Sequence, residues 1–207
     1  MEKGLIIIPC VGEDINTLVH KDMVQQCIIG IENTTDKTQY EIYLGINNYI
    51  SFAYGVNLGL KEFLMNSNYQ SFSGVVICTD DMILFKREWL EDFLKEAKEN
   101  VGMVCQTSQW RKWFIPMGLC YIKKEVINKV GLLDEQFRIA EMEDIDYSIR
   151  VVEAGFKLAT LDYDIAEHLG SKTLLSSPKW AKEEIKKNKE RFKEKWKGTK
   201  YVDMLGL

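Results

Sequence analysis

Hydrophobic runs alternate with amphipathic stretches along most of the 207-residue chain. Short apolar runs bounded by polar residues predict buried strands, whereas apolar positions that recur every three or four residues predict helices. Strands are expected at 4–10, 39–47, 73–79, 101–108, 156–162 and from residue 117 onward. Helices are expected at 21–33, 52–66, 88–100 and 142–155, with a short one that ends at residue 131. This alternation predicts an α/β fold in which helices flank a mixed sheet.

Local signals place the ends of two of these elements. Pro9 is expected to stop the first strand, because proline has no N–H for a ladder hydrogen bond. Gly155 stands where a left-handed residue caps the helix 142–155. In that helix, Ile145, Ile149 and Val152 are expected to form a single buried stripe.

Residues 178–207 are much richer in lysine than the chain before them. Ala181, Ile185, Phe192 and Trp196 follow one another at helical spacings, which predicts one amphipathic helix. We therefore expect a domain at 1–177 and a basic helix at 178–207 that packs on the domain or extends it. A basic arm that holds an anionic acceptor or a membrane surface is the alternative interpretation.

The composition is that of an ordinary soluble globular protein, with 46% hydrophobic and 28% charged residues. The formal charge of -4 gives no overall attraction to nucleic acid or to anionic membranes. No apolar stretch approaches the ~20 residues of a membrane helix, and residues 1–14 do not resemble a signal peptide. The five cysteines include no Cys-x-x-Cys pair, which argues against zinc and predicts reduced, buried thiols in a cytoplasmic protein.

Two adjacent carboxylates, Asp80 and Asp81, follow the apolar strand 73–79. Open α/β sheets bind their ligands at the carboxyl ends of the strands. Carboxylates there can hold Mg²⁺ or Mn²⁺ together with phosphate oxygens, and such an ion stabilises a departing diphosphate. A turn or a helix cap is the competing interpretation for Asp80.

The second half of the chain carries an ordered set of further motifs. They are Gly118, "KVGLLDEQF" (129–137), Glu143-Asp144-Ile145-Asp146, "EAGFKLA" (153–159) and His168. Upstream stand "SFAYGVNLGLKEF" (51–63) and "TDD" (79–81). Each motif alone is weak, but the set in this order resembles family 2 glycosyltransferases of the GT-A fold, over roughly residues 40 to 170.

The resemblance implies a donor site for a nucleotide-diphosphate sugar. It implies that Asn47, Asn57, Asp80 and Asp81 contact the donor, and that Asp81 and His168 bind Mn²⁺ or Mg²⁺. A structural role is the competing interpretation for His168. The chain departs from the family at two points. Thr79 replaces the first acid of the Asp-x-Asp motif, and the turn after the second strand offers Asn47 in place of an aspartate.

The resemblance also implies inverting transfer, with Asp144 as the general base and Glu143 positioning it or contacting the acceptor. An attacking hydroxyl must lose a proton, and one carboxylate can accept it. The alternative is that the acidic residues only complement the dipole of the helix that begins there. Trp110 and Trp113 are candidates to stack on the acceptor, with core packing as the competing account.

Two other functions remain open from the sequence. A non-catalytic relative would bind a nucleotide or a glycan without transferring it. A nucleotide transferase would need a glycine-rich, basic loop after the first strand, and residues 9–18 lack one. For a glycosyltransferase, the acceptor could be a glycan, a small molecule or modified nucleic acid.

Overall fold

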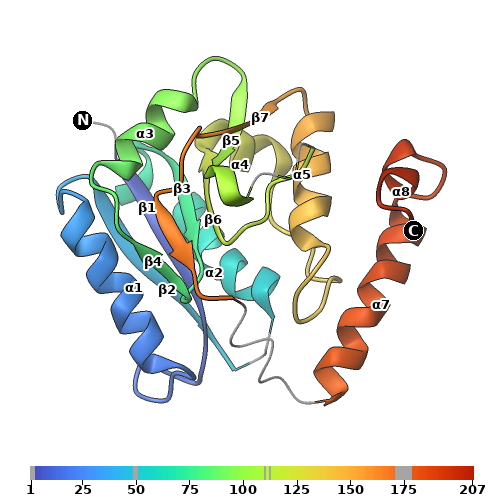
Figure 1. Ribbon diagram of the computed structural model, residues 1–207, viewed down its shortest axis with the longest axis horizontal. Coiled ribbons are helices and arrows are strands. Elements are labelled where there is room, and N and C mark those ends of the chain that lie inside the picture. Colours follow the sequence, from blue (N-terminus) through green and yellow to red (C-terminus); the bar gives the residue numbers. More distant parts are fainter. Residues whose placement is uncertain (1–2, 49–50, 110, 112, 171–178) are drawn as a thin grey trace.

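A computed structural model describes residues 3–48, 51–109, 111, 113–170 and 179–207 (Figure 1). Its main sheet consists of β1 (Lys3–Val11), β2 (Tyr40–Asn47), β3 (Phe72–Cys78), β5 (Val101–Cys105), β6 (Leu119–Lys123) and β7 (Lys157–Thr160). The strand order is β2-β1-β3-β6-β5-β7. Only β6 runs antiparallel to its neighbours, whereas the other pairs in the sheet are parallel. The predicted mixed α/β sheet is therefore confirmed.

Helices cover both faces of this sheet. They are α1 (Lys21–Thr34), α2 (Phe52–Met65), α3 (Trp89–Glu96), α4 (Lys124–Val130) and α5 (Glu143–Glu153). Ile6 and Ile8 of β1 pack with α1 and α3 on one face. Leu5 and Ile7 pack with α2, α4 and α5 on the other face. Every second side chain of a strand points to the same face, so the continuous apolar run of β1 fills two layers of core.

Two details of the sequence prediction are wrong, and each has a physical cause. Pro9 does not end β1, which continues to Val11. Pairing with β3 stops at Ile7, so Pro9 lies where one side of the strand is unpaired and its missing N–H costs no ladder bond. Val152 is 41% exposed, and Val151 is buried in its place. Helix α5 packs on the sheet along one side and on the C-terminal segment along another, and Val152 faces neither.

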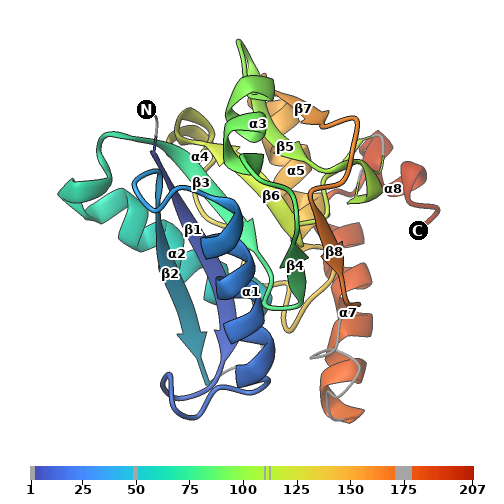
Figure 2. The same cartoon turned by 60° about the vertical axis from the view of Figure 1, so that its left-hand side comes forward.

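A second, two-stranded sheet was not predicted. It pairs β4 (Met82–Leu84) antiparallel with β8 (Ala166–His168), and Met82 lies opposite His168 (Figure 2). Strands of three residues are too short to give a periodic hydrophobic signal. The pairing brings His168 beside the carboxylates that precede β4.

Glycines allow α2 to lie very close to β1 and β2. A Cβ atom on Gly45 would lie 2.1 Å from the carbonyl oxygen of Gly55, and one on Gly59 would lie 2.5 Å from Ile7. These contacts explain why the helix 52–66 carries glycines in its interior despite their low helix propensity. They also fix the end of β2, and with it the position of Asn47.

We expect Gly59→Ala to lower the free energy of unfolding by about 1–3 kcal/mol, because the added methyl group overpacks the core against Ile7. Urea unfolding followed by circular dichroism measures this change. Lys61→Ala is the matched control, since Lys61 lies on the same helix with 45% of its side chain exposed. Equal stability of the two variants would contradict the close approach.

The C-terminal segment forms α7 (Lys179–Lys195) and α8 (Lys200–Met204). Ala181, Ile185 and Phe192 are buried, as the apolar stripe predicts. Phe192 packs with residues of α5 and α8, and Figure 1 shows α7 running beside α5. This contact favours the packing interpretation over a free basic arm. The domain boundary at residue 177 stays a prediction, because 171–178 lie outside the described residues.

All five cysteines are buried and carry free thiols, which agrees with the prediction from their spacing. Within the described ranges, no helix is both long enough and apolar enough to cross a membrane.

Candidate functional site

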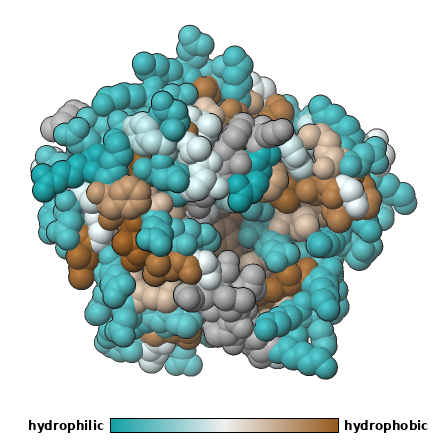
Figure 3. Space-filling model, viewed as in Figure 1, coloured by the Kyte–Doolittle hydropathy of each residue, from teal (hydrophilic) through white to brown (hydrophobic). Residues whose placement is uncertain are grey.

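A cavity of about 240 Å³ lies at the carboxyl ends of β1, β2 and β3. Figure 3 shows the molecule hollowed near the centre of the face seen in Figure 1. The polar lining of the cavity consists of residues that are far apart in the sequence: Asn47, Ser51, Thr79, Asp80, Asp81, Glu143, Asp144 and His168. The predicted carboxylate pairs, Asp80 with Asp81 and Glu143 with Asp144, therefore line the same cavity.

Asp81 and His168 both line the cavity and contact each other. Asp81 Oδ2 lies 3.0 Å from His168 Nε2, and Asp81 Oδ1 accepts a 2.7 Å hydrogen bond from the Thr79 hydroxyl. Burial alone would raise the pKa of Asp81, but the hydrogen bonds from His168 and Thr79 outweigh it and hold the pKa below its usual value. The hydrogen bond to Asp81 raises the pKa of His168, against the opposing effect of burial. The structure thus keeps Asp81 ionised.

These two side chains fit adjacent ligands of one divalent ion. Two ligands at right angles, each about 2.1 Å from an octahedral ion, lie about 3 Å apart. That spacing matches the 3.0 Å between Asp81 Oδ2 and His168 Nε2. The part of the chain that the structure describes brings together no set of three His, Cys, Asp or Glu side chains around one point. Phosphate oxygens of a bound ligand and water would therefore complete the shell.

Asp80 lines the cavity next to this pair. Burial, and then the negative charge of Asp81, raise the pKa of Asp80 to about 6. Two adjacent carboxylates in a partly dry site repel each other, so a bound cation would relieve a cost that the free protein carries.

Glu143 and Asp144 begin α5 and line the same cavity. Asp144 is partly buried, its Oδ1 accepts a 2.8 Å hydrogen bond from the N–H of Ile145, and burial raises its pKa to about 6. Glu143 is only 5% exposed, and its Oε2 has no hydrogen-bond partner. Burial, and then the charge of Asp144, raise the pKa of Glu143 well above its usual value. Perturbed carboxyls of this kind are typical of general acids and bases.

Asn47 lines the cavity, and its side chain has a single acceptor that is not used. Its side-chain amide donates to the carbonyl oxygens of Cys10, at 3.2 Å, and Gly45, at 3.4 Å. Its Oδ1 is buried and has no partner. Flipping the amide would place Oδ1 against two carbonyl oxygens, so the orientation is fixed. A buried acceptor without a donor is costly, and a ligand N–H or O–H in the cavity would satisfy it.

Two other predicted site residues lie elsewhere. Asn57 is 1% exposed and does not line the cavity. Its amide binds both the N–H and the carbonyl oxygen of Leu133, which fixes α2 to the segment after α4. Trp113 packs on Phe114 and Tyr201, with centroid distances of 5.1 and 6.5 Å, as the core-packing account predicts. Trp110 lies outside the described residues.

The sequence reasoning missed part of the apolar wall. Pro116, Met117, Ile139 and Ala140 also line the cavity. Gly118 was noted only as part of a motif, and its carbonyl oxygen accepts a 2.8 Å hydrogen bond from the Thr79 N–H. No periodic or compositional signal marks 138–142 as a cavity wall, because the segment belongs to no helix or strand.

We expect Glu143→Gln to stabilise the fold near pH 7 by about 1–3 kcal/mol, because it removes the ionisation cost of a buried carboxyl. The folded-state pKa of Glu143 is raised, so the folded protein holds the proton of this carboxyl more tightly than the unfolded chain does. The stability that this proton contributes is fully present below pH 4.5 and is lost as the pH rises through the folded-state pKa. The advantage of the variant should therefore grow from pH 4.5 to pH 8. Urea unfolding at several pH values tests this, with Glu141→Gln as the exposed control. A constant difference between the two variants would contradict it.

The sequence matches no protein-family model and no curated protein. Solved structures do resemble this chain. The catalytic domain of Drosophila beta1,4galactosyltransferase 7 in complex with xylobiose has a TM-score of 0.65 and 13% identity, over 86% of this chain and 75% of that one. A mutant of that protein in complex with manganese, UDP-Gal and xylobiose has a TM-score of 0.61 and 11% identity, over 85% and 75%.

The mannosyltransferase PcManGT from Pyrobaculum calidifontis, in complex with GDP-Man and Mn2+, also has a TM-score of 0.61. It is 12% identical to this chain, and the match covers 83% of this chain and 59% of that one. At sequence identities this low, the structural similarity establishes the fold alone. The protein has the GT-A fold, as its sequence motifs predicted. Membership of family 2 stays a prediction.

Proposed function

We propose that the protein is a glycosyltransferase that moves a sugar from a nucleotide-diphosphate donor to an acceptor hydroxyl. The observation that carries the proposal is the single cavity at the strand ends, which contains both carboxylate pairs and His168. The fold supports it, because the structures that resemble this chain include a galactosyltransferase with UDP-Gal and a mannosyltransferase with GDP-Man.

Asp81 and His168 would hold the donor's diphosphate through Mn²⁺ or Mg²⁺. Both neighbouring complexes contain manganese, and a carboxylate with an imidazole suits that ion. When bound, the ion would neutralise the negative charge of the departing diphosphate. Thr79 orients the Asp81 carboxylate through its 2.7 Å hydrogen bond, so it serves the site although it replaces an acid.

Asp144 would accept the proton of the attacking acceptor hydroxyl. A pKa of about 6 leaves it ionised at neutral pH while keeping it more basic than an ordinary aspartate. Direct attack by the acceptor, with no enzyme nucleophile, gives inversion at the anomeric carbon. Asn47 would accept a hydrogen bond from the nucleotide through its unused Oδ1.

The decisive experiment is a panel of nucleotide sugars, each tested with Mn²⁺, with Mg²⁺ and with a chelator. Thermal stabilisation reports binding, and chromatography of the released nucleoside diphosphate reports transfer or hydrolysis. We expect one sugar nucleotide to stabilise the protein only when a metal is present, and to be slowly hydrolysed. Metal-dependent binding with no release of nucleoside diphosphate for any donor would favour a non-catalytic binding protein.

A further inference from the structure

The segment that leads into Glu143 and Asp144 has an unfavourable backbone conformation. Ile139, Glu141 and Met142 have φ angles of 69°, 71° and 80°, in the left-handed region that residues other than glycine avoid. Such conformations are unfavourable for these residue types and persist only where surrounding contacts hold them. The described ranges contain six non-glycine residues with left-handed φ angles, and these three are half of them.

The strained segment is part of the candidate active site. Ile139 and Ala140 line the cavity, and Met142 is the residue that precedes the first turn of α5. No side chain caps this end of α5. The position of Glu143 and Asp144 therefore depends on whatever holds 138–142 in place.

Asn188 of α7 makes four of the contacts that hold it, beside a 2.8 Å hydrogen bond from the N–H of Phe52 to the carbonyl oxygen of Ile139. Its side-chain amide donates to the carbonyl oxygens of Arg138 at 2.8 Å, Ala140 at 2.8 Å and Glu141 at 3.1 Å. Its Oδ1 accepts from the N–H of Arg138 at 3.1 Å. Asn188 is fully buried within a helix that is otherwise mostly charged. One side chain thus satisfies four backbone groups of a segment that has no ladder of its own.

Arg191 fixes the orientation of this amide. Its Nη1 donates a 2.7 Å hydrogen bond to Asn188 Oδ1. Arg191 thus fixes the position of the amide oxygen, and the three carbonyl groups fix the position of the amide nitrogen. Asn188 cannot turn away without losing all of these contacts at once.

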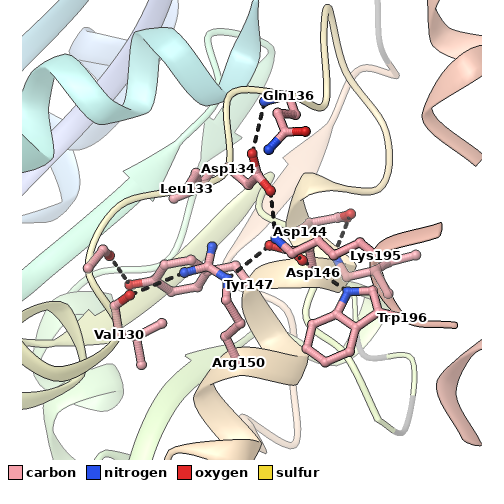
Figure 4. Close-up of polar contacts among 12 residues, drawn as sticks. Val130, Leu133, Asp134, Gln136, Asp144, Asp146, Tyr147, Arg150, Lys195 and Trp196 are labelled. Atoms are coloured by element: carbon pink, nitrogen blue, oxygen red, sulfur yellow. Dashed lines mark hydrogen bonds and ion pairs between the residues drawn. The ribbon is translucent and has the colours of Figure 1, made fainter. Parts of the chain in front are cut away.

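The end of α7 makes a second attachment, on the other side of Asp144. Asp146 is fully buried, and its Oδ1 accepts from Lys195 Nζ at 2.7 Å and from Trp196 Nε1 at 3.0 Å (Figure 4). Its Oδ2 accepts from Arg150 at 2.9 Å. The C-terminal segment therefore contacts the chain both before and after the Glu143–Asp144 pair.

We propose that Asn188 is a positioning residue of the active site: it holds the strained segment 138–142 so that Glu143 and Asp144 face the cavity. The C-terminal segment would then be a required part of the site rather than a separate binding arm. This inference rests on the proposed function for its catalytic consequence, although the structural consequence can be measured without it.

The test compares the wild type with Asn188→Ala, which removes the amide without adding charge, and with Asn188→Asp, which turns the donor toward the three carbonyls into an acceptor. Tyr201→Phe is the matched control, because it removes one 2.5 Å hydrogen bond of the C-terminal segment, to Glu153, away from 138–142. Hydrogen exchange by mass spectrometry of the peptide spanning 138–146 is the first readout, and turnover is the second.

We expect both Asn188 variants to exchange faster in 138–146 than the wild type, while Tyr201→Phe does not. Turnover should fall on the order of 10²-fold in Asn188→Ala, since small misplacements of a catalytic group have effects of that size. Donor KM should change little, because Asp81 and His168 belong to β4 and β8 and their surroundings, not to 138–142 or α5. If Asn188→Asp does not fold, Asn188→Ala alone decides the matter.

Unchanged exchange of 138–146 in Asn188→Ala would overturn the inference. So would a turnover loss no larger than that of Tyr201→Phe, because it would make Asn188 one structural contact among others. A wild type that transfers no sugar to any acceptor would instead refute the proposed function. The exchange measurement would then still show whether Asn188 holds the segment.

Discussion

Asp144→Asn is expected to lower sugar transfer by about 10²–10⁴-fold while leaving donor affinity nearly unchanged. The substitution keeps the shape of the side chain, and its Oδ1 can still accept from the N–H of Ile145. What it removes is the ability to take up a proton. Donor binding should persist, because the proposed metal and diphosphate contacts belong to Asp81 and His168, which bond with each other.

The pH dependence of the wild type provides an independent check. Burial raises the pKa of Asp144 to about 6, so the carboxylate is protonated, and unable to act as a base, below that pH. Turnover should therefore fall about tenfold per pH unit below pH 6, and the residual activity of Asp144→Asn should lack this fall.

Stability distinguishes a base from a structural residue. Because the folded-state pKa of Asp144 is raised above 3.8, ionisation destabilises the fold as the pH rises through 6. Asp144→Asn should then melt no lower than the wild type at pH 8. Near-normal turnover combined with a lowered melting temperature would mean that Asp144 only supports the helix end, and the proposed enzyme would lose its base.

The sequence predicted the layers of this fold well because the strands and helices that form them are long. The run around Ile6 to Ile8 and the stripe of α1 give strong signals. Asp81 and Asp144, which the sequence singled out, both line the cavity. The contact between Asp81 and His168 depends on pairing between two three-residue strands, β4 and β8, which carry no periodic signal of their own.

Other features of the site depend on contacts that no local pattern reveals. Asn47 and Asn57 look alike in the sequence, yet Oδ1 of Asn47 is buried without a partner, whereas the amide of Asn57 bonds with Leu133 and Glu135. Asn188 reads as one more polar residue of a lysine-rich helix, although it is buried against four backbone groups. A single polar residue at a buried helical position, here in phase with Ala181, Ile185 and Phe192, is the signal that could have identified it.

Asp81→Asn is expected to abolish metal-dependent binding of the nucleotide sugar. The variant removes the negative charge that divalent ions require, while its side chain can still bond with Thr79 and His168, so the fold should survive. For the wild type, donor at 100 times its Kd, with Mn²⁺ present, stabilises the fold by about 2.7 kcal/mol. For Asp81→Asn, the same additions should leave the melting temperature unchanged.

Asp80→Asn is the matched control for this substitution, because it removes a charge of the same kind at the neighbouring position. Asp80 has no hydrogen bond to His168 among the described contacts, and its pKa is raised rather than lowered, which is the opposite of Asp81. Its loss should therefore weaken donor binding less than the loss of Asp81 does. The assignment of Asp81 as the metal ligand fails if Asp81→Asn retains the full Mn²⁺-dependent stabilisation, or if Asp80→Asn loses more of it.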